Sequence, residues 1–175
     1  MSAREAANNV STIRLTGTLA FFMRVLVSAN NLLVFYVALE GVSLLAFVLT
    51  ALPKTQTSVE SSLKYFIQSS LASVVLLLGI ARRFASTQDL DFSAIRDVLT
   101  EDPITDLTFA ALFRITVARL FKISAFPGQF WAPDVYRGPL ASVLTVFAVC
   151  VKGAAALARF NIYANFRRFT HTQFS

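Results

Sequence analysis

The sequence predicts an all-α fold: a single membrane domain, residues 1–175, built as a bundle of about five transmembrane helices. Composition is the first reason, because 55% of the residues are hydrophobic and only 15% are charged, whereas about 25% charged residues are usual in a soluble domain. The second reason is three long apolar runs that each contain a single charged residue: Glu40 in residues 31–52, Lys64 in residues 61–81 and Lys152 in residues 140–158. Each run is close to the roughly 20 residues that a helix needs to cross a bilayer. Lipid favours helices because their backbone hydrogen bonds are internal.

The first two predicted helices cover residues 12–28 and 31–52. In the first of them, Arg14 and Arg24 lie close enough to the ends for their charged groups to reach the membrane interface. The second stops before Pro53, whose ring disfavours helical backbone at the preceding residue. Because only a short polar link separates the two runs, we expect them to form an antiparallel pair.

The third predicted helix, residues 61–82, follows hydroxyl side chains that suit an N-cap: Ser58, Ser61 and Ser62. Ser69 and Ser73 are four residues apart, so they share a face that allows a neighbouring helix to approach closely. Residues 85–106 are the one clearly soluble stretch and contain six of the ten acidic residues. We expect a solvated connection there, with a short surface helix near residues 93–99.

The fourth predicted helix, residues 105–126, carries three cations within an arc of about 140° at 100° per residue: Arg114, Arg119 and Lys122. This arrangement indicates one polar side that faces protein or water. The helix should break at Pro127-Gly128, because proline removes a backbone donor. Gly138-Pro139 then opens a fifth helix, residues 140–160, since proline suits a first helical position.

The remaining composition argues against several function classes. The formal net charge is +6, but the sixteen basic residues are scattered without forming a stripe, so nucleic acid is not an expected partner. The single cysteine, Cys150, lies in an apolar run and is interpreted as a small apolar residue. The sequence has no Gly-rich phosphate loop, no Cys or His cluster for a metal or haem, and no nucleophile with an adjacent base. We therefore expect no metal and no cofactor in this chain.

Ionisable residues inside apolar runs are the candidate functional residues: Glu40, Lys64, Lys122 and Lys152. A charge near the bilayer centre costs roughly 2.5–3.5 kcal/mol on insertion scales, and it marks an ion or proton pathway when it faces the protein interior. A buried structural ion pair is the alternative interpretation. The presence of Glu40, Lys122 and Lys152 in three separate segments favours a functional role. Lys64 lies near the start of its helix, where anchoring at the interface and function are both open.

Burial disfavours the charged form of such groups, and an opposite charge within about 4–6 Å favours it. If Glu40 approaches Lys122, the lysine retains its proton. If the glutamate withdraws, the lysine can pass the proton to Lys152 or to water. Such a set moves protons only when another component shifts the glutamate, so the energy must come from elsewhere.

Four stretches carry a family resemblance: residues 32–44 around Glu40, residues 60–66 with Lys64, residues 122–138 from Lys122 through Pro127-Gly128 to Gly138, and Lys152, thirteen residues after Pro139. They resemble the antiporter-like subunits of respiratory complex I, and most closely NADH dehydrogenase subunit 2. In that family they look like the fifth helix, the start of the sixth, the broken seventh and the eighth. The resemblance implies that the chain covers about the fourth to eighth helices of the family.

The resemblance also implies residue roles. Glu40 would modulate the pathway, Lys122 would be its central protonatable group and Lys152 would pass protons onward. Together they would form half of a proton channel for translocation coupled to NADH oxidation by ubiquinone. Gln129 stands where the family usually has histidine, which puts a relay role at that position in doubt. NADH, FMN, iron–sulfur clusters and ubiquinone would lie in other subunits.

Location and partners follow from the same resemblance. The chain would be a multi-pass protein of the inner mitochondrial membrane, in contact with lipid and with other membrane-arm subunits of complex I. The second half of the family has no counterpart in this sequence, so we expect either that a separate chain supplies it or that this subunit has lost it. Two rival functions are open: a structural scaffold of the same complex that no longer pumps, and a subunit of a cation/proton antiporter.

Overall fold

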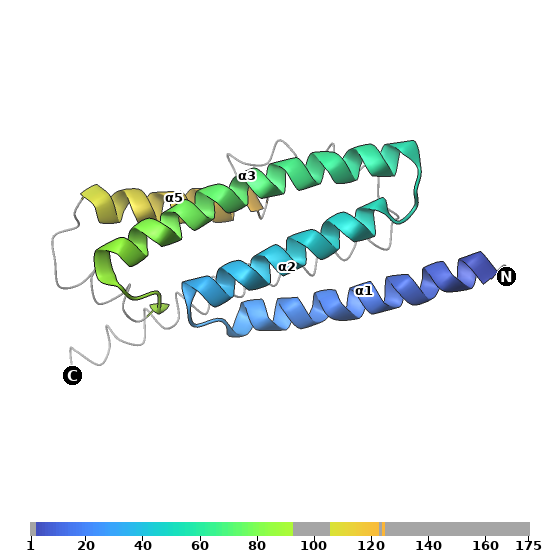
Figure 1. The fold of residues 1–175 in the computed structure, drawn as a ribbon, viewed down its shortest axis with the longest axis horizontal. Helices are drawn as coiled ribbons and strands as arrows, with labels where there is room; N and C mark the ends of the chain where they lie inside the picture. Colours follow the sequence, from blue (N-terminus) through green and yellow to red (C-terminus); the bar gives the residue numbers. More distant parts are fainter. Residues whose placement is uncertain (1–2, 93–105, 123, 125–175) are drawn as a thin grey trace.

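The structure is a computed structural model, and it describes residues 3–92, 106–122 and 124. These residues form four helices, shown in Figure 1: α1 (Ala3–Ser28), α2 (Leu32–Ala51), α3 (Gln56–Thr87) and α5 (Asp106–Lys122). The described ranges contain no β-strand beyond one isolated bridge between Asn31 and Asp91, so the all-α prediction is confirmed for them. The predicted fifth helix, residues 140–160, and the break at Pro127-Gly128 lie outside the described residues.

Three helices are long and apolar enough to cross a membrane, through Val10–Ser28, Leu32–Ala51 and Gln56–Ala85. Large apolar side chains are exposed on the outside of the bundle, among them Ile13, Phe21, Leu71 and Val74. An extended apolar surface of this kind is rare on a soluble monomer and suits contact with lipid or with other membrane helices. The described part of the chain is therefore a polytopic helical membrane bundle.

The ends of α3 lie outside the predicted bounds, at Gln56 rather than residue 61 and at Thr87 rather than residue 82. At the start, Thr55 is the N-cap. Its hydroxyl accepts from the Ser58 backbone N–H at 3.2 Å, while the Ser58 hydroxyl accepts from the Thr55 N–H at 3.0 Å. This reciprocal pairing satisfies two backbone donors that would otherwise be unpaired. At the far end, Gln88 adopts a left-handed conformation and donates to the Phe84 carbonyl at 2.7 Å, which ends the helix.

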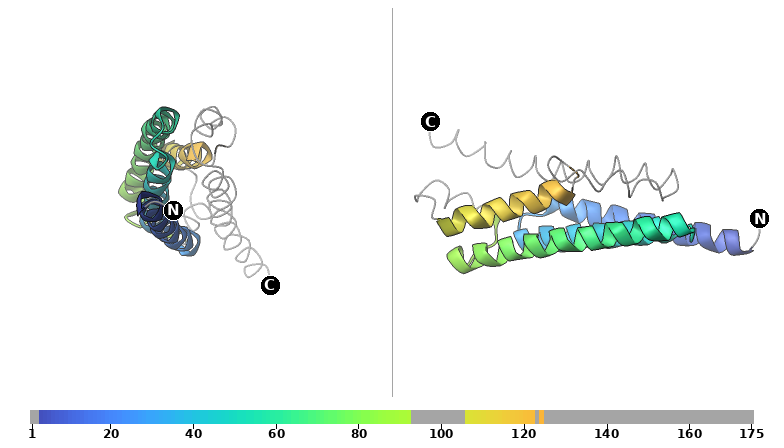
Figure 2. Two further views of the ribbon diagram at one scale, coloured as in Figure 1. Left: turned by 90° about the vertical axis from the view of Figure 1, so that its right-hand side faces the viewer. Right: turned by 90° about the horizontal axis from the view of Figure 1, so that it is seen from above.

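The helices pack in a row, with α1 against α2, α2 against α3, and α3 against α5. Figure 1 shows α1 and α2 as the predicted antiparallel pair, and Figure 2 shows α5 lying along α3. Buried apolar residues join the layers. One cluster joins α1 to α2, through Leu19, Val42, Ala46 and Leu49. Another joins α2, α3 and α5, through Leu32, Leu76, Ile80, Ile115 and Ala118.

Gly79 sets the close approach of α3 and α5. A Cβ atom at this position would lie 2.8 Å from Ile115 Cγ1 and 3.2 Å from the backbone oxygen of Ala111. Because both distances are shorter than ordinary van der Waals contact, any side chain larger than hydrogen would push α5 away from α3. Since α5 carries Lys122 at its end, this contact helps to place the lysine.

The chain that follows α3 returns to the link between α1 and α2. The Leu32 N–H donates to the Leu90 carbonyl at 2.9 Å, and the Phe92 N–H donates to the Asn30 carbonyl at 3.0 Å. The Asn31 side chain adds a hydrogen bond to Asp91 Oδ1 at 2.7 Å. The start of the predicted solvated connection, residues 85–106, is thus partly helix and partly docked backbone; residues 93–105 lie outside the described part.

Candidate functional site

The centre of the candidate site is an ion pair between α2 and α5. Lys122 Nζ lies 2.6 Å from Glu40 Oε1, a short charge-assisted hydrogen bond. The lysine side chain is only 6% exposed and the glutamate side chain 25%. The structure therefore places together two of the four residues that the sequence singled out.

Lys122 is the last residue of α5, and the chain turns directly after it. Ser124 has a positive φ of 56°, and its N–H donates to the Phe121 carbonyl at 3.1 Å. The predicted helix ran to residue 126, whereas α5 ends at Lys122, because a left-handed residue does not continue an α-helix. A helix C-terminus carries partial negative charge and stabilises a nearby cation. Lys122 thus has this end of α5 in addition to Glu40 as countercharge.

Two serine hydroxyls complete the ion pair. Ser43, one turn after Glu40 on α2, donates its own proton to the Leu39 carbonyl at 2.8 Å and accepts from Lys122 Nζ at 3.0 Å. On α3, the Ser73 hydroxyl contacts Glu40 Oε1 and also lies 2.8 Å from the Ser69 carbonyl. A hydroxyl has one proton to donate, so Ser73 can serve only one of these two acceptors at a time.

The role of Ser73 goes beyond the sequence interpretation. The spacing of Ser69 and Ser73 predicted close helix packing. The structure adds a direct contact of the Ser73 hydroxyl with the Glu40 carboxylate. Neither serine contact was visible in the sequence, because helical spacing alone does not say which way α2 and α3 are rotated toward each other.

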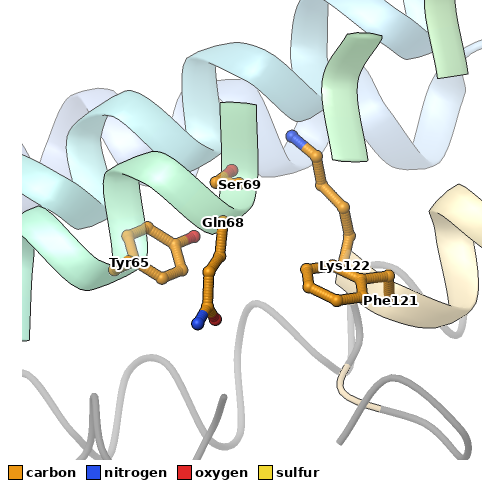
Figure 3. Close-up of a pocket in the computed structure, with 5 residues that line it drawn as sticks. All are labelled: Tyr65, Gln68, Ser69, Phe121 and Lys122. Atoms are coloured by element: carbon orange, nitrogen blue, oxygen red, sulfur yellow. The ribbon is translucent and has the colours of Figure 1, made fainter. Parts of the chain in front are cut away.

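A small pocket lies beside the lysine, between α3 and α5. It is lined by Tyr65, Gln68, Ser69, Phe121 and Lys122, as Figure 3 shows. In this view the Lys122 nitrogen points toward α2 and away from the Gln68 carboxamide, which lies on the opposite side of the pocket. The amine of Lys122 is thus directed at Glu40 and not at Gln68.

Lys64 does not belong to the Glu40 cluster. It pairs with Glu60 across one helical turn at 2.7 Å, and both side chains are about half exposed. Ser73 follows Lys64 by nine positions on α3. This spacing corresponds to roughly 13 Å along the helix axis. Lys152 and Gln129 lie outside the described residues, so the structure gives no position for them.

The two arginines of α5 have partners different from that of Lys122. The Arg119 guanidinium lies over the Phe35 ring, 4.9 Å from its centroid, a cation–π contact. Arg114 donates to the Ala110 carbonyl of its own helix at 3.4 Å. The three cations on the expected polar side of this helix thus have different partners: Arg119 contacts an aromatic ring, Arg114 a backbone carbonyl and Lys122 a carboxylate. An aromatic partner leaves no charge pattern in the sequence by which it could have been found.

The described residues contain no group of three or more His, Cys, Asp or Glu side chains arranged to bind a metal ion. The chemistry available at this site is proton exchange between a carboxylate and an amine, with hydroxyl groups as hydrogen-bonding partners. Lys122 is the more buried of the two groups, so the distance to the Glu40 carboxylate affects how strongly the lysine holds its proton.

Comparison with known proteins identifies the family of this site. Residues 29–174 match the family described as NADH:quinone oxidoreductase/Mrp antiporter, transmembrane. The chain belongs to this family. The matched range includes Glu40, Lys64, Lys122 and Lys152, so every candidate residue lies within the NADH:quinone oxidoreductase/Mrp antiporter region.

Individual relatives agree with this family. The chain is 40% identical over 134 residues to NADH-quinone oxidoreductase subunit N of Erythrobacter litoralis, covering 76% of this chain and 27% of the relative. The corresponding protein of Pelagibacter ubique is 42% identical over 134 residues, with 76% and 28% covered. The chain therefore spans less than a third of the length of these relatives. They are named subunit N, where the sequence resemblance had pointed to subunit 2.

Solved structures share the arrangement of helices. A chain of respiratory complex I from Thermus thermophilus, solved with bound aureothin, is 33% identical, with a TM-score of 0.73 over 82% of this chain and 32% of that chain. A chain of a membrane-bound sulfane sulfur reductase, an archaeal respiratory membrane complex, gives a TM-score of 0.76 at 24% identity, covering 83% of this chain and 30% of that chain. The second likeness concerns the fold alone.

Proposed function

We propose that this chain is part of an antiporter-like membrane subunit of a proton-pumping NADH:quinone oxidoreductase, and that it contributes half of a proton channel. The observation that carries the proposal is the shielded ion pair of Lys122 and Glu40, joined at 2.6 Å between two helices. Removing one partner from such a pair leaves the other charge uncompensated, at a cost of about 3–5 kcal/mol. When the pair separates, the buried charge on Lys122 becomes unfavourable, and release of its proton removes that charge.

The proposed mechanism has two states. In the first, Glu40 and Ser43 bind the protonated amine of Lys122. In the second, Glu40 moves away or becomes neutral, and the amine gives up its proton. Lys152 is the proposed acceptor on the basis of the family resemblance. The force that moves Glu40 would come from electron transfer in other subunits, where NADH, FMN, iron–sulfur clusters and ubiquinone would bind.

The test replaces Lys122 with methionine in the assembled complex in proteoliposomes and measures protons pumped per NADH oxidised. We expect the ratio to fall while NADH oxidation continues, because methionine has similar length but binds no proton. Lys54→Met is the matched control, since Lys54 lies exposed in the turn between α2 and α3. An unchanged ratio in Lys122→Met would contradict the assigned role.

A cation/proton antiporter is the second candidate, because the family description includes Mrp antiporters. Such a protein would exchange sodium for protons without NADH. A third candidate is a scaffold in which the ion pair never separates. Replacing Glu40 or Lys122 would then reduce the amount of assembled complex but leave the pumping ratio of the surviving complex unchanged.

The finer assignments are also proposals. We propose that the subunit is of the type named subunit N in the relatives, with subunit 2 as the name suggested by the sequence resemblance. Other membrane-arm subunits and lipid are the proposed partners, and mass spectrometry of complexes purified in mild detergent would show whether a companion chain supplies further helices. Location in the inner mitochondrial membrane is a prediction of the resemblance; the relatives described above are bacterial, and organelle fractionation tests it.

A further inference from the structure

One polar group beside the candidate site has no role in the mechanism described so far. The Gln68 side-chain oxygen is buried, and it makes no hydrogen bond within the described part of the structure. Buried polar groups are almost always paired, with protein or with ordered water. Gln68 lines the pocket next to Lys122, and its carboxamide stands across that pocket from Phe121 in Figure 3.

The pocket suits a water molecule. Its space admits about one water, and a buried water needs two to four polar partners. Gln68 and Ser69 contribute an amide and a hydroxyl from neighbouring positions on α3, and Lys122 approaches from α5. The pocket thus combines room for water with a polar atom that requires a partner.

We propose that Gln68 positions a water molecule in this pocket, and that Lys122 exchanges its proton with this water when Glu40 no longer binds it. The inference rests on the proposed function. Lys122 lines the pocket and its amine lies at Glu40, so rotation about the side-chain bonds would carry the amine from the carboxylate to the water. Gln68 is a positioning residue here, because it acts through the water and does not itself take the proton.

The position of Gln68 on α3 gives the exchange a direction. Lys64 and Gln68 are four residues apart, so they are neighbours on the same face of the helix. Lys64 now turns toward Glu60. A water held by Gln68 would therefore lie on the same face of α3 as Lys64, the single lysine of this helix, which makes Lys64 the proposed next group on that side of the pocket.

The experiment compares Gln68→Met, Gln68→Glu and Lys122→Met in the assembled complex, with protons pumped per NADH and thermal stability as readouts. Methionine retains the length of glutamine without a hydrogen-bonding group, whereas glutamate retains the acceptor oxygen. We expect the pumping ratio to fall several-fold in Gln68→Met, with thermal stability unchanged. We expect recovery in Gln68→Glu.

Three results would overturn the inference. The first is normal pumping in Gln68→Met while Lys122→Met is impaired. The second is equal impairment in both Gln68 variants. The third is a higher melting temperature with normal pumping in Gln68→Met, which is the behaviour of a dry pocket. If Lys122→Met itself pumps normally, the proposed function fails instead, so the two failures are distinct.

If Gln68→Met does not assemble, the wild-type complex decides the question. A high-resolution cryo-electron microscopy map should show a water within hydrogen-bonding distance of the Gln68 side-chain oxygen. A protein side chain in that place, or an apolar contact without water, would overturn the inference.

Discussion

At the scale of single residues, the site depends on hydroxyl groups as much as on charges. Lys122 donates to Ser43 as well as to Glu40, and Glu40 contacts Ser73 as well as Lys122. The Ser73 proton can go to Glu40 or to the Ser69 carbonyl. Ser73 is therefore able to stabilise Glu40 as a carboxylate and to keep a partner when the glutamate moves.

This arrangement predicts the effect of Ser73→Ala. The substitution removes a hydrogen bond to a charged group, which contributes about 1.5–3 kcal/mol in proteins. We expect a lower melting temperature of the purified complex and a smaller pumping ratio, because Lys122 is then the one remaining partner of Glu40 among the residues that the structure describes. The measurements are thermal unfolding in detergent and proton uptake in vesicles.

Ser28→Ala provides the comparison for this variant. The Ser28 hydroxyl also donates to a backbone carbonyl of its own helix, Val25 at 3.2 Å, but it is exposed and lies at the end of α1. If Ser73→Ala behaves like Ser28→Ala in both thermal unfolding and proton uptake, the contact of Ser73 with Glu40 contributes neither to stability nor to pumping.

At the scale of helices, the position of Lys122 follows from the packing of α5 on α3. The contact at Gly79 leaves no room for a side chain, since a Cβ atom there would overlap Ile115. Just beyond the C-terminal end of α3, residues 89–92 pair with the link between α1 and α2. Arg119 adds a cation–π contact from α5 to α2. Together these contacts place the end of α5 against Glu40.

Gly79→Ala should therefore disturb both stability and function. Overfilling a packed contact costs about 1–3 kcal/mol, and the relief of that overlap would move α5 away from α3 and so displace Lys122 from its position at Glu40. We expect a lower melting temperature and reduced pumping. The control is Gly17→Ala, because nothing lies within 4 Å of a Cβ atom at Gly17.

The control should show the opposite sign. Replacing glycine by alanine inside a helix adds roughly 0.5–1 kcal/mol of stability when space is available. A Gly79→Ala variant as stable as Gly17→Ala would show that the α3–α5 contact does not determine the position of Lys122.

Much of this helical arrangement could be predicted from the sequence, and the exceptions have physical causes. Long apolar runs around Glu40 and Lys64 predicted α2 and α3, because burial in lipid requires them. The ends of α3 depended on a Thr55 cap and a left-handed Gln88, which are local hydrogen-bonding choices that hydropathy does not report. The docking of residues 89–92 depended on a distant link, and their acidic character suggested solvent instead.

The site itself was predictable only in part. Charge burial singled out Glu40, Lys64 and Lys122, but their pairing depends on how three helices meet. That geometry separates Lys64, which pairs with Glu60, from the pair of Glu40 and Lys122. A glutamine among many polar residues gave no signal either, because Gln68 stands out only once its burial is known.

At the scale of the whole molecule, the chain corresponds to only part of its longer relatives. The chain covers 27% and 28% of two relatives to which it is about 40% identical, and it covers 32% of the matching complex I chain. Its outer surface retains exposed apolar residues along α1, α2 and α3. We expect this surface to contact lipid and other helices of the complex, so the ion pair lies within a membrane assembly.

In the proposed function, Glu40 and Lys122 act as one unit that controls a proton. A double-mutant cycle tests this coupling most directly, with protons pumped per NADH measured for Glu40→Gln, Lys122→Met and the double variant in proteoliposomes. Residues that act as a unit give strongly non-additive effects. We expect that each single variant lowers the ratio and that the double variant is no worse than Lys122→Met alone. Losses that multiply in the double variant, or a normal ratio in all three, would contradict it.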